Sequence, residues 1–128
     1  MFIMTENEIS KIIVDCAYKI HTRLGPGLIE NTYQECLMYE LLKHNLKVEK
    51  EKSLPVIYDD VKLNVGYRID LLVENKMIIE IKSVESLNDI HLAQILTYLK
   101  LSKCKLGLLI NFNVTLIKHG IKRVVNNL

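Results

Sequence analysis

The sequence predicts an α/β protein in which helices flank a central mixed β-sheet, and three observations support this fold class. Apolar residues recur at helical spacing before residue 45 and again over residues 87–102. Between residues 46 and 83 their period changes to two, as in half-buried strands. Residues 106–112 form a continuous apolar run, which is typical of a strand buried on both faces. The 128-residue chain shows no linker or repeat, so we expect a single domain over residues 1–128.

Two helices are expected at the start of the chain. Thr5 followed by Glu8 has the spacing of a capping box and predicts a helix that runs to about Leu24. Its apolar face would consist of Ile9, Ile12, Ile13, Cys16, Ala17 and Ile20. The Gly-Pro-Gly sequence at 25–27 must end this helix. A second helix is expected over residues 29–45, with a buried stripe formed by Tyr33, Leu37 and Leu41 and, alongside, Met38 and Leu42.

The strands follow from residue 46 onward. Val48 lies among alternating charges, which suits a solvent-exposed edge strand. The other elements expected are strands at 54–58, 61–73 and 77–83, a helix at 87–102, a strand at 106–112, and a short strand or helical turn at 121–125. The strands at 61–73 and 77–83 should form a hairpin around the polar turn at 74–76. The predicted order is therefore α-α-β-β-β-β-α-β.

The composition excludes several classes of protein. Residues AVILMFWYC make up 49% and DEKR 25% of the chain, as in ordinary globular proteins. No apolar run approaches the ~18 residues that cross a bilayer, and the first five residues are too short for a signal peptide. The three cysteines, Cys16, Cys36 and Cys104, are odd in number and far apart, which argues against a disulfide framework and a zinc site. We therefore expect a cytoplasmic location, reduced thiols and no membrane partner.

Charge is unevenly distributed along the chain. The totals are close, with 17 basic and 15 acidic residues, but Asp89 is the last acidic residue. The basic residues that follow it are Lys100, Lys103, Lys105, Lys118, Lys122 and Arg123. A basic C-terminal third is typical of a surface that contacts a polyanion such as nucleic acid. The alternative, which this signal alone favours, is a solvated lysine face that keeps the protein soluble.

Three charged residues on the expected central hairpin are the candidates for chemistry. A hairpin centred on Asn75 would place Asp70 directly opposite Glu80. Like charges that face each other across a ladder destabilise a sheet, and the flanking residues are strongly apolar, so burial is expected. Two carboxylates held together in such a place need a cation, and a ligand set of oxygens favours Mg²⁺ or Mn²⁺ over Zn²⁺.

Lys82 follows Glu80 on the same face of its strand. Beside a metal and a phosphate, its ammonium can orient a water molecule or stabilise charge that develops on phosphorus. The alternative is an ion pair of Lys82 with Glu80 or Asp70 on an exposed sheet face, which is the commoner meaning of so short a pattern. The apolar neighbours at 71–73 and 78–79 count against an exposed face.

Further polar residues lie on two of the expected helices. Glu30 precedes Tyr33 by three residues, which predicts that it lies on the inward stripe of its helix. It would either interact with the helix dipole in the first turn or supply a third oxygen ligand to the hairpin site. On the later helix, His91, Gln94 and Tyr98 form one stripe beside the apolar packing face, which consists of Leu92, Ile95, Leu96 and Leu99. This polar stripe either faces a site or is half-exposed, while the isolated His21 and His119 are expected to be structural or exposed.

Taken together, these residues resemble the core of the PD-(D/E)xK nuclease superfamily. Asp70 and the run Glu80-Ile81-Lys82 match its acidic motif on consecutive strands, with Ile69 in place of the proline in the superfamily's name. Gln94-x-x-x-Tyr98 on the next helix resembles the QxxxY motif of the recombination-exonuclease branch.

A closer resemblance concerns residues 27–33. Their sequence, Gly-Leu-Ile-Glu-Asn-Thr-Tyr, matches the pattern that names the GxxExxY family, a small prokaryotic family within the same superfamily. Other stretches similar to that family are at 24–27, 66–68, 93–99 and 107–112. The resemblance extends over residues 5–125.

The resemblance implies a PD-(D/E)xK (restriction endonuclease-like) core with a central mixed sheet flanked by helices. The divalent metal, Mg²⁺ or Mn²⁺, would be bound by Asp70, Glu80, the backbone carbonyl of Ile81, and Glu30. Lys82 would position or activate the attacking water, and Gln94 and Tyr98 would support the site and the DNA backbone.

Two classes of function follow from this sequence. The leading hypothesis is a metal-dependent nuclease that hydrolyses DNA phosphodiester bonds. The alternative is a catalytically silent module that keeps the nuclease-like fold and binds nucleic acid or protein, because intact site residues show only that the chemistry is available. A third reading is a fold whose acids pair with lysines and bind no metal. Because so short a chain has little surface with which to clamp a duplex, we also expect a homodimer or a larger partner.

Overall fold

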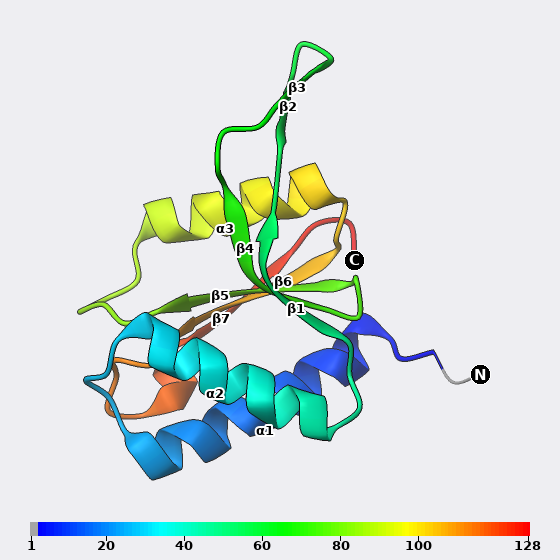
Figure 1. Ribbon diagram of the computed structural model, residues 1–128. Coiled ribbons are helices and arrows are strands. Elements are labelled where there is room, and N and C mark those ends of the chain that lie inside the picture. Colours follow the sequence, from blue (N-terminus) through cyan, green and yellow to red (C-terminus); the bar gives the residue numbers. More distant parts are fainter. Residues whose placement is uncertain (1–2) are drawn as a thin grey trace.

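A five-stranded mixed sheet forms the centre of the computed structural model, which describes residues 3–128 (Figure 1). Its strand order is β1-β4-β5-β6-β7, with bounds Val48–Ser53, Arg68–Val73, Met77–Lys82, Leu106–Asn111 and Ile121–Val125. Only the β5–β6 pair is parallel, and helix α3 (Asp89–Ser102) connects these two strands. The predicted fold class, a mixed sheet flanked by helices, is confirmed.

Helices cover both faces of the sheet, as Figure 1 shows. Helices α1 (Glu6–Leu24) and α2 (Glu30–Lys43) lie on one face, and α3 lies on the other. Because strand side chains alternate, Ile79 and Ile81 of β5 pack in the core beneath α1 and α2, whereas Ile78 packs in the core beneath α3. Glu80 and Lys82 share the side of β5 to which Ile78 belongs, so they face the layer of α3.

The N-terminal helices form for the reasons that the sequence indicates. The Thr5 hydroxyl accepts the N–H of Glu8 at 3.2 Å, and the Glu8 carboxylate accepts the N–H of Thr5 at 2.9 Å, which completes the predicted capping box. Gly25 has φ +66°, a conformation that favours glycine, at the end of α1. Leu42 was expected in the buried stripe of α2 but is exposed, because it lies about 100° around the helix from the buried Leu41. Among residues 3–128, no helix is both long enough and apolar enough to cross a membrane.

The strand expected over residues 61–73 is two strands, and this prediction was wrong. Strand β3 (Val61–Leu63) pairs with β2 (Val56–Tyr58) in a separate two-stranded ribbon that projects from the sheet, whereas β4 pairs with β1 and β5 (Figure 1). The chain is strand-forming on both sides of the break, but Gly66, at φ +84°, redirects it between two different pairing partners.

The C-terminal elements are close to those expected. All six residues of β6 are buried, as the apolar run predicts for a central strand. Residues 121–125 form the edge strand β7, not a helical turn. A short 3₁₀ helix, Ile117–His119, precedes β7. Buried His21 lies beside this region and bonds through Nε2 to the carbonyl of Val114 at 2.7 Å, which is the structural role expected for it.

Candidate functional site

The candidate site forms where strands β4 and β5 stop pairing through their backbones. The ladder runs from Val73–Met77 to Leu71–Ile79, and the same register places Asp70 opposite Glu80. At this point the side chains provide the links between the strands. The N–H of Asp70 donates to Oε2 of Glu80 at 2.8 Å, and the N–H of Ile81 donates to Oδ2 of Asp70 at 2.8 Å. Each carboxylate is therefore held by the backbone of the opposite strand.

Burial makes this pair of acids electrostatically unfavourable. Glu80 is only 4% exposed, and burial together with the charge of Asp70 raises its pKa to about 8. Burial also raises the pKa of Asp70, which is half-buried, while the N–H of Ile81 and the charge of Lys82 act in the opposite direction. A buried carboxylate beside a second acid is stabilised by holding a proton or by a nearby cation. The environment of Glu80 therefore favours its protonated form or a bound positive ion.

Lys82 lies near the two acids without pairing with them. Its charge lowers the pKa of both Asp70 and Glu80, yet none of the ion pairs among residues 3–128 includes Lys82. Its carbonyl accepts the N–H of Phe112 at 3.0 Å, which fixes the end of β5 against the chain that follows β6. The alternative of a simple ion pair on the sheet face is therefore not what the structure shows.

Glu30 comes from α2 to the same end of β5. Its Oε2 accepts the N–H of Ser83 at 3.0 Å, and the Ser83 hydroxyl donates to the carbonyl of Leu28 at 2.6 Å. The charge of Glu30 raises the pKa of both Asp70 and Glu80. Glu30 itself is exposed, so the expectation that it lies on the inward stripe was wrong, because it begins α2 beyond the edge of the core.

A hollow of about 510 Å³ opens beside this contact. It is lined by Gly27, Leu28, Ile29, Glu30, Ser83 and Asn113. Within residues 3–128, no three acidic, histidine or cysteine side chains lie close enough together to hold a metal ion. The structure thus brings Asp70 and Glu80 together and leaves Glu30 next to them, outside a three-side-chain cluster.

Helix α3 provides a wall of the site through Tyr98. This residue is 6% exposed, and its ring lies 6.2 Å from the ring of Tyr67, centroid to centroid. Burial raises the pKa of Tyr98, and the charges of Glu80 and Asp70 raise it further, while Gln94 acts in the opposite direction. Tyr98 is therefore close enough to the acids for their charges to act on it, and Gln94 acts on Tyr98 as a hydrogen-bond partner.

His91, the first member of that stripe, has a different role. Its Nδ1 accepts the N–H of Asn88 at 3.2 Å, and Oδ1 of Asn88 accepts the N–H of His91 at 3.1 Å. This reciprocal pair caps the start of α3. His91 therefore stabilises the start of α3.

The sequence reasoning missed Ser83 and Asn111. Asn111 is 1% exposed, and its amide bonds to both the N–H and the carbonyl of Val84, at 3.1 and 3.0 Å. These contacts fix the turn that follows Lys82. The available signal was an amide within an otherwise apolar run, because a buried amide must find hydrogen-bond partners.

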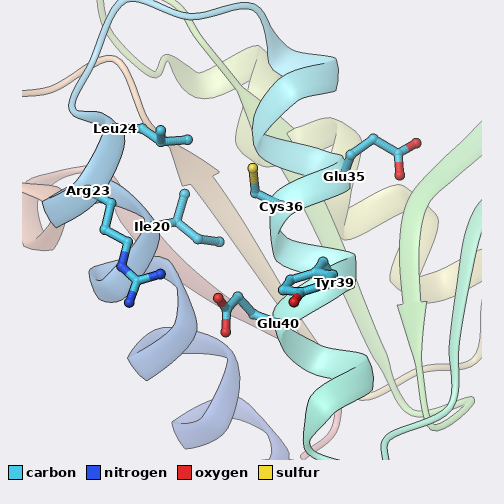
Figure 2. A pocket seen from close by; sticks show the side chains of 7 residues that line it. All are labelled: Ile20, Arg23, Leu24, Glu35, Cys36, Tyr39 and Glu40. Carbon is cyan, nitrogen blue, oxygen red and sulfur yellow. The ribbon is translucent and has the colours of Figure 1, made fainter.

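A second hollow, between α1 and α2, has a different character (Figure 2). Its volume is about 390 Å³, and it is lined by Ile20, Arg23, Leu24, Glu35, Cys36, Tyr39 and Glu40. Glu40, whose carboxylate Figure 2 shows between the two helices, accepts from Lys19 at 2.9 Å and pairs with Lys43 at 3.2 Å. The Glu40 carboxylate is therefore neutralised by two lysines, and neither Asp70 nor Glu80 lines this hollow.

The fold and this acidic pair define the class of the protein. A mixed sheet with helices on both faces, carrying two converging acids and a lysine at the end of a hairpin, is a nuclease-like α/β fold. The family model described as "PD-(D/E)XK nuclease superfamily" matches residues 7–124, and the chain belongs to this superfamily. Neither the curated proteins nor the solved structures contain a match to the chain.

Superfamily members generally use divalent metals, and the donor set here fits such an ion. Glu80 is a buried carboxylate with no cation paired to it in the described part of the chain. Its neighbour Asp70 supplies a second hard oxygen donor. Hard oxygen ligands are those that Mg²⁺ and Mn²⁺ prefer.

Proposed function

We propose that this chain is a nuclease of the GxxExxY type that hydrolyses phosphodiester bonds of nucleic acid, DNA above all. The observation that carries the proposal is the buried Asp70–Glu80 pair, which has no cation paired to it within residues 3–128. Within this proposal, residues 1–128 act as one domain in the cytoplasm, as expected from the composition. A homodimer belongs to the same proposal and is checked by sedimentation.

Asp70, Glu80 and the backbone carbonyl of Ile81 would hold Mg²⁺ or Mn²⁺, with Glu30 as an additional oxygen donor. When bound, such an ion supplies a Lewis acid that polarises a phosphate oxygen and makes water more acidic. The two backbone N–H groups that hold the acids pre-orient them, which reduces the reorganisation that binding requires.

The remaining residues act on water and phosphate. Lys82 forms no ion pair within residues 3–128, so its ammonium can orient a water molecule or stabilise charge on phosphorus. Tyr98, on which the charges of both acids act, and its hydrogen-bond partner Gln94 would support the site and the nucleic-acid backbone from the α3 side. The hollow beside Glu30 and Ser83 is open enough for a backbone phosphate to approach.

The test is nicking of plasmid DNA by the purified chain with Mg²⁺ or Mn²⁺. We expect cleavage that stops on chelation and that falls ~100-fold or more in Asp70→Asn and in Lys82→Met. Asp15→Asn is the matched control, because it removes an exposed carboxylate on α1 and should cleave like the wild type. If both site variants cleave as well as the wild type, the assignment of these residues is wrong.

Two further outcomes would change the proposal. If the wild type cleaves neither DNA nor RNA but still binds them, the chain is a silent binding module, which the basic residues after Asp89 would favour. Calorimetry with Mn²⁺ separates these readings from a purely structural acid pair. We expect heat of binding in the wild type and none in Asp70→Asn, and no heat in either protein would contradict a metal site.

A further inference from the structure

The lysines of this chain fall into two groups. All six in the first 55 residues form ion pairs with acids: Lys11, Lys19, Lys43, Lys47, Lys50 and Lys52. None of the lysines after residue 55 does so within the described chain. The candidate site accounts for Lys82, but the other unpaired lysines are not explained by it.

Three of the unpaired lysines surround one hollow of about 350 Å³. This lysine hollow is lined by Lys100, Lys103, Lys105, Asn126 and Asn127. Lys100 lies in the last turn of α3, Lys103 caps that helix, and Lys105 precedes β6, while the two asparagines follow β7. Segments far apart in the sequence thus bring three ammonium groups and two amides to one place.

The backbone around the lysine hollow is held in a defined shape. The N–H of Asn126 donates to the carbonyl of Lys105 at 2.8 Å, and the N–H of Cys104 donates to the Ser102 hydroxyl at 3.2 Å. Lys103 has φ +64°, the left-handed conformation that ends many helices. Glu6 is the acid whose charge acts on the neighbouring Cys104 thiol, but it forms no ion pair with the lysines.

The lysine hollow lies at the end of the sheet opposite to the acidic pair. Strands β5 and β6 are parallel, with Lys82 beside Asn111 at one end and Met77 beside Leu106 at the other. The acidic pair lies partway along this length: Glu80 pairs with Leu109, four residues after Lys105, so the two places are ~13 Å apart along the parallel strands. In duplex DNA each strand carries one phosphate per ~3.4 Å of helix axis, so this separation corresponds to about four base pairs.

We propose that the lysine hollow binds backbone phosphates of the nucleic acid, about four base pairs from the bond held at the acidic pair. This inference rests on the proposed function for its choice of polyanion. No acid follows Asp89 in the sequence, so α3 presents no negative charge between its first turn and the hollow. A structural alternative is that the lysines neutralise the C-terminal end of the α3 dipole.

The experiment measures binding without cleavage, using the full chain with Asp70→Asn and a labelled DNA duplex of about 20 base pairs. In that background, Lys103→Gln/Lys105→Gln should weaken binding ~10-fold at low salt and reduce the slope of log affinity against log salt by about 2. The matched control is Lys11→Gln/Lys47→Gln, which removes the same charge from lysines that already have acidic partners, and it should change both quantities much less.

The outcomes separate the inference from the proposed function. Equal binding by the lysine variant and its control overturns the inference, and so does a lowered melting temperature with unchanged affinity, which would show a role in capping α3. Binding to anionic lipid vesicles but not to DNA also overturns it. If the wild type binds DNA with the expected dependence on Lys103 and Lys105 but cleaves nothing, the inference stands and the proposed hydrolysis fails.

Discussion

Two buried glutamates in this protein have opposite environments. Glu40 is 7% exposed and Glu80 is 4% exposed, so burial alone does not distinguish them. Hydrogen bonds from Lys19 and Lys43 lower the pKa of Glu40 against the effect of burial, and the charges of these lysines act in the same direction. Burial and the charge of Asp70 raise the pKa of Glu80. Glu40 is neutralised by two lysines, whereas Glu80 forms no ion pair within residues 3–128.

The difference in charge partners between Glu40 and Glu80 indicates different roles for the two glutamates. The Glu40 ion pairs connect α1 to α2, because Lys19 belongs to α1 while Glu40 and Lys43 belong to α2. The raised pKa of Glu80 indicates a free-energy cost for its charged form in the folded state. Such local conflicts are expected at functional sites, so the contrast supports a site for a cation at Glu80.

The largest expected effect comes from Glu80→Gln. The amide keeps the shape of the side chain but removes its charge, so cleavage should fall ~1,000-fold, since metal-assisted catalysis is worth several kcal/mol. The folded state should be at least as stable as that of the wild type at pH 8, because repulsion with Asp70 is removed. Plasmid nicking and urea denaturation measure the two effects. Loss of stability with retained activity would reverse the roles assigned to the two glutamates.

The second prediction concerns pH. The pKa of Glu80 is about 8 in the folded state against an ordinary value of 4.5, so between these values the folded state retains a proton that the unfolded state has lost. The contribution of Glu80 to the free energy of unfolding of the metal-free protein should therefore be largest below about pH 4.5. It should decrease by a few kcal/mol as the pH rises from there to about 8. Urea denaturation as a function of pH measures this slope.

Glu80→Gln is the control for that slope, because a glutamine cannot titrate. The variant should lose most of the decline between about pH 5 and 8, whereas Glu40→Gln should keep it. Equal slopes in the wild type and in Glu80→Gln would show that Glu80 is ionised in the folded protein at neutral pH, and the argument for a missing cation would then fail.

The sequence could predict the acidic pair because hairpin geometry is local. Glu74 and Asn75 both adopt positive φ, and the turn closes with the N–H of Lys76 on the carbonyl of Val73, which fixes the register. Once that register is set, Asp70 must meet Glu80. The crossed hydrogen bonds to the opposite backbones could not be predicted, because they depend on where the two strands diverge.

Contacts between distant segments could not be predicted from the sequence. The Lys19–Glu40 pair joins two helices whose relative rotation depends on packing against the sheet. The break between β3 and β4 was missed for a similar reason, since both halves of residues 61–73 are strand-forming and only the choice of pairing partner separates them. Helical and strand periodicity, which depends on residues close in sequence, predicted the other helices and strands to within a few residues but not the 3₁₀ helix Ile117–His119.

The smallest expected effect is that of Glu40→Gln. Its two lysine partners are partly exposed, so the ion pairs are screened, and their loss should lower the free energy of unfolding by about 1 kcal/mol at neutral pH. Because the folded-state pKa of Glu40 lies below its ordinary value, this stability is present above pH 4.5 and is lost as pH falls through the folded pKa. The wild type and Glu40→Gln should therefore converge in stability in acid, as urea denaturation at several pH values would show. This dependence of stability on pH has the opposite sign to that expected for Glu80.

The same variant should cleave DNA at the wild-type rate, because Glu40 lies outside the acidic pair. A Glu40→Gln protein that lost activity without losing stability would show that the hollow between α1 and α2 takes part in the reaction.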